Sequence, residues 1–130
     1  MKKPFHEVPG SLVAPLGFKT AGVFCDIKRL GTGKGSNKGL KRDLALIASE
    51  APATVAGMFT TNQVCAAPVK LCVEHVKNGT AQAIVVNSGN ANACTGKTGV
   101  RDATTMAAEV GKFLGMALED VLVASTAGSA

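Results

Sequence analysis

The sequence predicts an α/β fold, because short β-branched and apolar stretches alternate with two segments of helical periodicity. The strand-like stretches include "TAGVFCDIK" (20–28) and "AQAIVV" (81–86), and apolar residues recur at helical spacing over 68–78 and 100–114. The chain has 130 residues, 46% of them hydrophobic and 18% charged, which is the composition of one folded domain. With five Phe and no Tyr or Trp, its core must be built from Ala, Val, Leu and Ile.

The first half of the chain is expected to form three strands. Residues 1–18 contain Pro4, Pro9 and Pro15 and form an irregular, partly extended arm before the strand over 20–28. A glycine-rich loop, "LGTGKGSNKG" (30–39), follows this strand. The stretches "DLALIAS" (43–49) and "ATVAGMFTTN" (53–62) are then expected as second and third strands. Their closeness in sequence predicts an antiparallel meander.

The second half reads as helix, strand, helix and strand. Pro68 suits the first turn of a helix, and Gly79 suits its left-handed C-terminal cap. The strand over 81–86 is apolar on both faces and is expected in the middle of the sheet. The next helix covers 100–115, with Thr98 as its N-cap and Gly115 as its stop. Its apolar stripe comprises Val100, Ala103, Met106, Ala107, Val110, Phe113 and Leu114, and "LEDVLVAST" (118–126) turns into the final strand.

The net charge of +5 does not by itself indicate a nucleic-acid-binding protein. Residues 1–42 hold nine basic against two acidic side chains, whereas residues 43–130 carry a net charge of −2. Neither a pattern of aromatic residues interleaved with the basic ones nor a recognition helix is visible, so this segment is interpreted as a solvated face. The four cysteines form no C-x-x-C pair, the two histidines add no zinc-like spacing, and no apolar run reaches membrane length. These features favour a reduced, cytoplasmic protein without a metal site.

Three patterns of chemical interest are weak. In "GTGKGSNKG" Lys34 is followed by Gly35 and by no helical pattern, so the P-loop pattern fails and an exposed connection is the better interpretation. Cys94 lies near a helix start, where a thiolate is stabilised, but no histidine lies near it in sequence to act as a base. His75 is expected to be a surface or hydrogen-bonded histidine. Asp102 and Glu109 are expected on the exposed side of their helix, with no second carboxylate beside them.

The stretch "NSGNANACTGKTG" (87–99) is the most informative. It leaves the central strand through Asn and Gly residues, which tolerate left-handed backbone, and it leads into a helix. Thr95 and Gly96 would then lie at the mouth of the fold, with backbone N–H groups turned outward. Such donors could stabilise an oxyanion in acyl transfer. On spacing alone, a plain strand-to-helix connection is the better interpretation of the stretch.

The same residues carry a resemblance to a known family. "AIVVNSGNANACTGKTG" resembles the signature segment of the ornithine acetyltransferase family, the bifunctional glutamate N-acetyltransferases of arginine biosynthesis. "APLGFKTAGVFCDIK", "KRDLALIASEAPATVAGMFTTNQVCAAPVKLCVEHVKNG" and "DVLVAST" agree with the family in order and spacing. The resemblance covers residues 8–126.

The resemblance implies a specific chemistry and fold. Thr95 and Gly96 match the Thr-Gly of the family's oxyanion hole. The family precursor cuts itself at an Ala-Thr bond, and the new N-terminal threonine takes acetyl from N-acetylornithine and passes it to glutamate, without a metal or dissociable cofactor. Use of acetyl-CoA as a further donor stays open. The implied fold is a layered α/β sandwich shared with self-cleaving aminopeptidases, and the implied assembly is an α/β heterotetramer without nucleic acid or membrane.

The resemblance also suggests that residues 1–126 are the N-terminal, α-chain part of such a domain and that the nucleophile lies beyond residue 130. Thr126 does not match the nucleophile, the "AGSA" ending (127–130) departs from the family pattern, and the 30–39 loop has no assigned role. The chain alone is therefore expected to be inactive. A self-cleaving aminopeptidase relative, and a non-catalytic fragment that binds a complementary β chain, are the alternatives.

Overall fold

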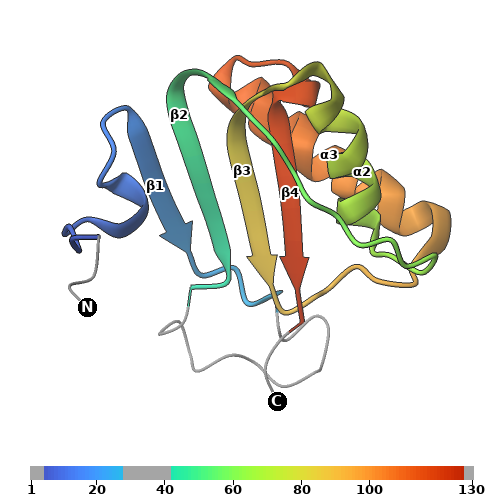
Figure 1. The fold of residues 1–130 in the computed structure, drawn as a ribbon. Helices are drawn as coiled ribbons and strands as arrows, with labels where there is room; N and C mark the ends of the chain where they lie inside the picture. Colours follow the sequence, from blue (N-terminus) through green and yellow to red (C-terminus); the bar gives the residue numbers. More distant parts are fainter. Residues whose placement is uncertain (1–4, 28–41, 128–130) are drawn as a thin grey trace.

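The computed structural model describes residues 5–27 and 42–127, and these form a four-stranded sheet with two α-helices (Figure 1). The strands are β1 (Phe18–Val23), β2 (Leu44–Thr54), β3 (Thr80–Ser88) and β4 (Val121–Thr126), and the helices are α2 (Ala67–His75) and α3 (Gly96–Leu114). Three 3-10 turns complete the described elements: η1 (Ser11–Val13), η3 (Val76–Asn78) and η4 (Leu118–Asp120). The predicted 30–39 loop and residues 128–130 lie outside the described residues.

The sheet has the order β1-β2-β3-β4. β1 pairs with β2 and β2 with β3 in antiparallel fashion, so the predicted meander is confirmed only for the pairing of its first two strands. β3 and β4 are parallel, and α3 connects them. The α/β class and the inner position of β3 are therefore confirmed.

The prediction of separate strands over 43–49 and 53–62 is wrong. One strand, β2, runs from Leu44 to Thr54, and its pairing register with β3 shifts between Ala48 and Ala53. Pro52 lies within this shift, where its missing N–H breaks no regular ladder. Beyond Thr54 the chain leaves the sheet, and the Asn62 and Val64 N–H groups bond to Thr60 Oγ1 (3.1 Å) and Asn62 Oδ1 (3.0 Å). Local side-chain acceptors replace the sheet partners that the predicted third strand would have used.

The predicted first strand over 20–28 also shifts, to Phe18–Val23. It ends because the Asp43 carboxylate accepts the N–H groups of Cys25 (2.6 Å) and Ile27 (2.7 Å), which turns this segment away from the ladder. Asp43 is only 4% exposed, and its carbonyl accepts the Ser88 N–H at 2.8 Å. One residue therefore joins the end of β1, the start of β2 and the end of β3.

The helix ends follow the local rules with one exception. Pro68 lies in the first turn of α2, Gly79 caps the following 3-10 turn with φ 77°, and Gly115 ends α3 with φ 70°. α3 begins earlier than predicted, so its N-cap is Thr95 and the assignment of Thr98 was wrong. Phe113 and Val100 do not belong to the buried stripe, because they are 84% and 39% exposed.

The core lies on one face of the sheet. Ala83 and Val85 of β3 and Val121 and Val123 of β4 are buried against Ala107 of α3. Partly buried residues complete this layer: Leu44, Leu46, Leu71, Met106, Val110, Leu114, Met116 and Leu118. The core residues of the strands alternate with residues whose side chains point to the opposite face of the sheet.

The edge of β4 is closed by two side chains of α2. Cys72 Sγ–H donates to the Val123 carbonyl (3.2 Å), and the Val123 N–H donates back to Cys72 Sγ (3.3 Å). His75, which is 7% exposed, bonds through Nδ1 to the Val121 carbonyl at 2.8 Å. A carbonyl only accepts, so Nδ1 carries the proton. The expectation that His75 is hydrogen-bonded is confirmed, and its position is buried.

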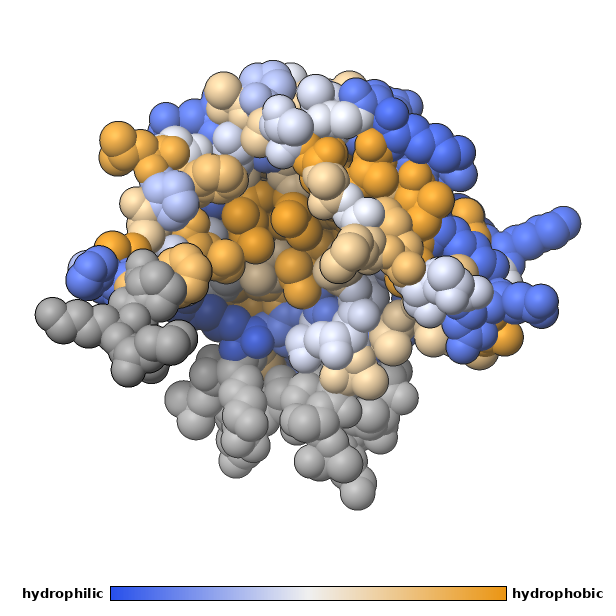
Figure 2. Space-filling view, viewed as in Figure 1, coloured by the Kyte–Doolittle hydropathy of each residue, from blue (hydrophilic) through white to orange (hydrophobic). Residues whose placement is uncertain are grey.

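The opposite face of the sheet is largely apolar, and neither described helix packs on it. Phe18, Ile47, Ile84 and Leu122 come from all four strands and line a shallow hollow of about 180 Å³. Figure 2 shows hydrophobic atoms gathered in a hollow at the centre of the face seen in Figure 1. This surface is called the open face below.

Candidate functional site

The loop between β3 and α3 contains an unusual density of left-handed residues. Asn92 has φ 49° and Cys94 φ 58°, and the flanking Gly89 and Gly96 have φ 119° and 60°. Asn is among the few residues with a side chain that adopt this region readily. The predicted Asn/Gly turn is therefore present, and it reverses the chain between Ser88 and the start of α3.

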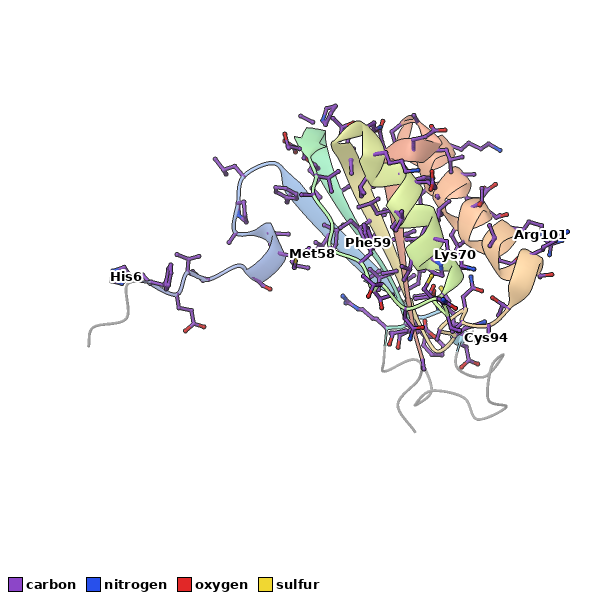
Figure 3. All side chains as sticks on the ribbon, turned by 45° about the vertical axis from the view of Figure 1, so that its right-hand side comes forward. His6, Met58, Phe59, Lys70, Cys94 and Arg101 are labelled. Atoms are coloured by element: carbon purple, nitrogen blue, oxygen red, sulfur yellow. The ribbon has the colours of Figure 1, made fainter. Side chains whose placement is uncertain are left out.

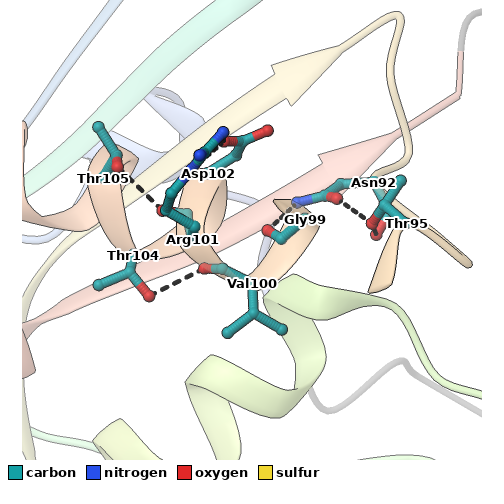
Figure 4. Close-up of polar contacts among 8 residues, drawn as sticks. All are labelled: Asn92, Thr95, Gly99, Val100, Arg101, Asp102, Thr104 and Thr105. Atoms are coloured by element: carbon teal, nitrogen blue, oxygen red, sulfur yellow. Dashed lines mark hydrogen bonds and ion pairs between the residues drawn. The ribbon is translucent and has the colours of Figure 1, made fainter. Parts of the chain in front are cut away.

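The Asn92 carboxamide is the centre of the loop (Figure 4). The Thr95 hydroxyl donates to Asn92 Oδ1 at 2.5 Å, and Asn92 Nδ2 donates to the Gly99 carbonyl in the first turns of α3 at 2.8 Å. One planar amide thus joins the end of the loop to the start of the helix.

A chain of hydrogen bonds connects Asn92 to the sheet. The Ser125 hydroxyl donates to Asn87 Oδ1 (2.5 Å), and Asn87 Nδ2 donates to the Asn90 carbonyl (2.8 Å). Asn90 Oδ1 in turn accepts the Asn92 N–H at 2.9 Å. Asn87 is 6% exposed, so this part of the chain is protected from water. The position of Thr95 is therefore tied to the ends of β3 and β4.

Thr95 separates two hollows. The first, of about 450 Å³, is lined by Ile27, Leu44, Asn87, Asn90, Asn92, Thr95, Thr98, Gly99, Asp102, Met106 and Ser125. The second, of about 310 Å³, is lined by Cys65, Ala67, Lys70, Cys94, Thr95, Gly96, Lys97 and Val100. Lys70 and Cys94 lie at the same end of the molecule, and Arg101 points outward from α3 (Figure 3). Only the second hollow includes Gly96.

Gly96 gives access to the backbone at the start of α3. A β-carbon on Gly96 would meet nothing within 4 Å, so the space in front of it is open. The first N–H groups of a helix have no acceptor within the helix, and no side chain caps α3. These N–H groups and the positive end of the helix dipole favour a developing negative charge.

The other residues singled out in the sequence do not form a second site. Cys94 is exposed and lines the second hollow with Cys65, whereas His75 is buried under β4. Asp102 and Glu109 are exposed as expected, and Asp102 also borders the first hollow. Among residues 5–27 and 42–127, no three His, Cys, Asp or Glu side chains are grouped to hold a metal ion.

The sequence interpretation did not single out Asn92 or Asp43. The signal for Asn92 was the recurrence of Asn at 87, 90 and 92, which was interpreted only as turn chemistry. Asp43 was included in a predicted strand, and its acceptor role depends on residues 25 and 27, which no local pattern pairs with it.

The comparisons with known proteins agree on one family. The ArgJ family model matches residues 20–128. The Arginine biosynthesis bifunctional protein ArgJ of Caldanaerobacter subterraneus subsp. tengcongensis is 52% identical over 117 residues, which are 90% of this chain and 27% of that protein. The protein of the same name from Symbiobacterium thermophilum is 49% identical over the same share of each chain. The chain therefore spans about a quarter of the length of these relatives.

Solved structures show the same similarity. A crystal structure of Arginine biosynthesis bifunctional protein argJ from Bacillus halodurans superimposes with a TM-score of 0.79 at 39% identity, covering 91% of this chain and 57% of that one. A crystal structure of ornithine acetyltransferase complexed with ornithine from Mycobacterium tuberculosis gives a TM-score of 0.75 at 39% identity, covering 87% of this chain and 57% of that one. Within the described residues, no helix combines the length and the apolar character needed to span a membrane.

Proposed function

The chain belongs to the ArgJ family, and from this premise we propose that it is the N-terminal part of an acetyltransferase that moves acetyl from N-acetylornithine to glutamate. In this proposal Thr95 and Gly96 form the oxyanion hole, and a threonine beyond residue 130 is the nucleophile. The observation that carries the proposal is the position of Thr95 and Gly96 at the uncapped start of α3, next to an open hollow.

The acetyl group is assigned to the second hollow, because only this hollow is lined by both Thr95 and Gly96. The threonine hydroxyl attacks the acetyl carbonyl, and its proton passes to the threonine's own amine or to an activated water. The carbonyl oxygen then carries the negative charge, and donors at Thr95 and Gly96 stabilise it. On collapse the same group returns the proton to the leaving amine, so that ornithine departs and acetyl-threonine remains. The glutamate amine then attacks this ester and gives up a proton, and the threonine hydroxyl is released as N-acetylglutamate forms.

Two lysines support the assignment of anionic substrates to this hollow. Lys70 and Lys97 both line it, and both substrates carry carboxylates. Their ammonium groups and the N-terminus of α3 create a positive potential at this end of the molecule. The proposal assigns no metal or dissociable cofactor to the reaction and leaves acetyl-CoA as a possible second donor to be tested.

The missing part of the protein is proposed to cover the open face. Apolar side chains of four strands are only partly covered there, and a soluble domain rarely leaves such a surface without a packed layer over it. The match covers 27% of a curated relative but 57% of a solved chain, so the solved chains are about half as long as the curated relatives. This ratio supports a protein divided into an α and a β chain, and we extend it to an α/β heterotetramer. The four free cysteines of this chain fit a cytoplasmic location.

The test uses the whole protein that contains this chain and measures acetyl transfer from N-acetylornithine to glutamate. Thr95→Ala should lower kcat by about 100- to 1,000-fold with little change in KM, because an oxyanion donor acts only in the transition state. Thr105→Ala is the matched control: its exposed hydroxyl bonds only to the Arg101 carbonyl of the preceding turn, and kcat should not change (Figure 4).

Three results would contradict the proposal. Equal kcat values for Thr95→Ala and Thr105→Ala would reduce the loop to a connection between β3 and α3. Hydrolysis of N-terminal amino acids without acetyl transfer would favour the self-cleaving aminopeptidase alternative. Acetyl transfer by the 130-residue chain alone would show that the nucleophile does not lie beyond residue 130. Thr126, at the end of β4, does not match the family's nucleophile.

A further inference from the structure

We propose that Asn92 and Gly99 are positioning residues that hold Thr95 in the orientation needed for acetyl transfer. The inference rests on the proposed role of Thr95 as part of the oxyanion hole. It assigns separate tasks to the two residues: Asn92 holds the Thr95 side chain by hydrogen bonding, and Gly99 leaves the space that this side chain occupies.

Asn92 fixes Thr95 with both ends of its carboxamide. Oδ1 accepts the Thr95 hydroxyl at 2.5 Å, and Nδ2 donates to the Gly99 carbonyl at 2.8 Å. The amide orientation follows from the second bond, because a carbonyl oxygen cannot donate to another carbonyl. The Thr95 hydroxyl also lies 3.3 Å from the Asn92 backbone carbonyl. Because a hydroxyl has one proton, Thr95 keeps this resting position until the oxyanion forms and then turns the proton from Asn92 to the oxyanion.

The backbone of Asn92 is itself held from the sheet. Its N–H donates to Asn90 Oδ1, and Asn90 is bonded to the buried Asn87. Asn92 also presents its carbonyl to the Ala67 N–H at the start of α2, at 3.2 Å. The residue therefore connects β3, α2 and α3, and its left-handed φ of 49° aims the side chain at Thr95.

Gly99 is required for steric reasons. A β-carbon at this position would overlap with Thr95 Oγ1 and Asn92 Oδ1, and it would lie 2.6 Å from Thr95 Cβ. Real β-carbons essentially never approach other heavy atoms within 3.0 Å. Neither neighbour is the free end of a long flexible side chain, so an alanine at 99 must displace the Thr95–Asn92 pair. Displacing a donor by about 1 Å is enough to cost about 100-fold in rate.

The main experiment compares three variants of the whole protein. Asn92→Gly removes the carboxamide and keeps the left-handed backbone without strain. Gly99→Ala adds the overlapping methyl group. Gly111→Ala is the control: this second buried glycine of α3 is also crowded, but by the Met116 carbonyl at 2.9 Å, at the far end of the helix from Thr95.

Asn92→Gly and Gly99→Ala should each lower kcat by about 100-fold with KM nearly unchanged, whereas Gly111→Ala should affect stability alone. If Asn92 acts through Thr95, the double variant Asn92→Gly/Thr95→Ala should be no slower than Thr95→Ala. Additive losses in that double variant, or a kcat of Asn92→Gly equal to that of Gly111→Ala, would overturn the inference.

A second readout is independent of activity. In NMR spectra of the 130-residue chain, Asn92→Gly should shift the amide resonances of Thr95 and Gly96, and Gly111→Ala should leave them in place. A whole wild-type protein without acetyl transfer would overturn the proposed function. It would not decide whether Asn92 positions Thr95, because the NMR resonances test that claim separately. Unchanged Thr95 and Gly96 resonances in Asn92→Gly would overturn the positioning itself.

Discussion

Asp43 provides a quantitative test of how the described segments are joined. Its buried carboxylate accepts two N–H groups, from Cys25 at 2.6 Å and Ile27 at 2.7 Å. Hydrogen bonds to a charged acceptor contribute about 1.5–3 kcal/mol each. Cys25 is exposed, so water can replace part of what is lost, and the lower end of that range applies. Asp43→Ala should therefore reduce the free energy of unfolding by about 3 kcal/mol.

Asp43→Asn separates the hydrogen bonds from the shape of the side chain. The amide keeps one acceptor oxygen and turns its NH₂ group toward the second N–H, so about half of the 3 kcal/mol should be lost. The assay is urea unfolding followed by circular dichroism, in which 3 kcal/mol lowers the midpoint by about 1–3 M. Asp102→Asn is the control, because Asp102 is exposed and pairs only weakly with Arg101, at 3.4 Å.

Equal midpoints for Asp43→Ala and Asp102→Asn would refute the reasoning. The end of β1 would then be held by the strand ladder alone, and the two short bonds of Asp43 would contribute nothing measurable.

Two further predictions concern α2 and the open face. Burial raises the pKa of the Cys72 thiol above 9.0 and outweighs the opposite effect of its hydrogen bond with the Val123 backbone. The unfolded chain therefore loses this proton at a lower pH than the folded chain. The free energy of unfolding should fall as the pH rises above 9.0, and Cys72→Ala should remove that part of the fall in urea titrations between about pH 8 and pH 10. The 130-residue chain should self-associate through its open face; Ile84→Glu should shift it toward the monomer in sedimentation velocity, whereas Ala108→Glu, on the exposed side of α3, should not. A wild-type chain that sediments as a compact monomer would contradict this last prediction.

Local rules predicted the parts of the fold that depend on few residues. Pro68, Gly79 and Gly115 mark helix ends through their own backbone preferences, and each marks one in the structure. The apolar run over 81–86 identified the inner strand for the same reason, since both of its faces are partly or fully buried.

Other parts depend on contacts that sequence periodicity does not contain. Phe113 fits the helical spacing, but its side chain is exposed in the structure. The first strand ends where the Cys25 N–H donates to the carboxylate of Asp43, which lies 18 residues further along the chain. At the candidate site the motif identified Thr95 and Gly96, whose roles remain predictions, but the bond between Thr95 and Asn92 required coordinates.

The position of α2 beside β4 has a consequence for how this sheet can be extended. Cys72 occupies the N–H and the carbonyl of Val123, and His75 occupies the carbonyl of Val121; an incoming strand would need these groups for pairing. β1, at the other end of the order β1-β2-β3-β4, has no such cover among the described residues. Unpaired edges are where chains join end to end into fibrils or capture foreign peptides. Among the described residues only the β1 edge is therefore open, so strand pairing along Phe18–Val23 would end at a dimer or at one donated strand and could not continue into a fibril.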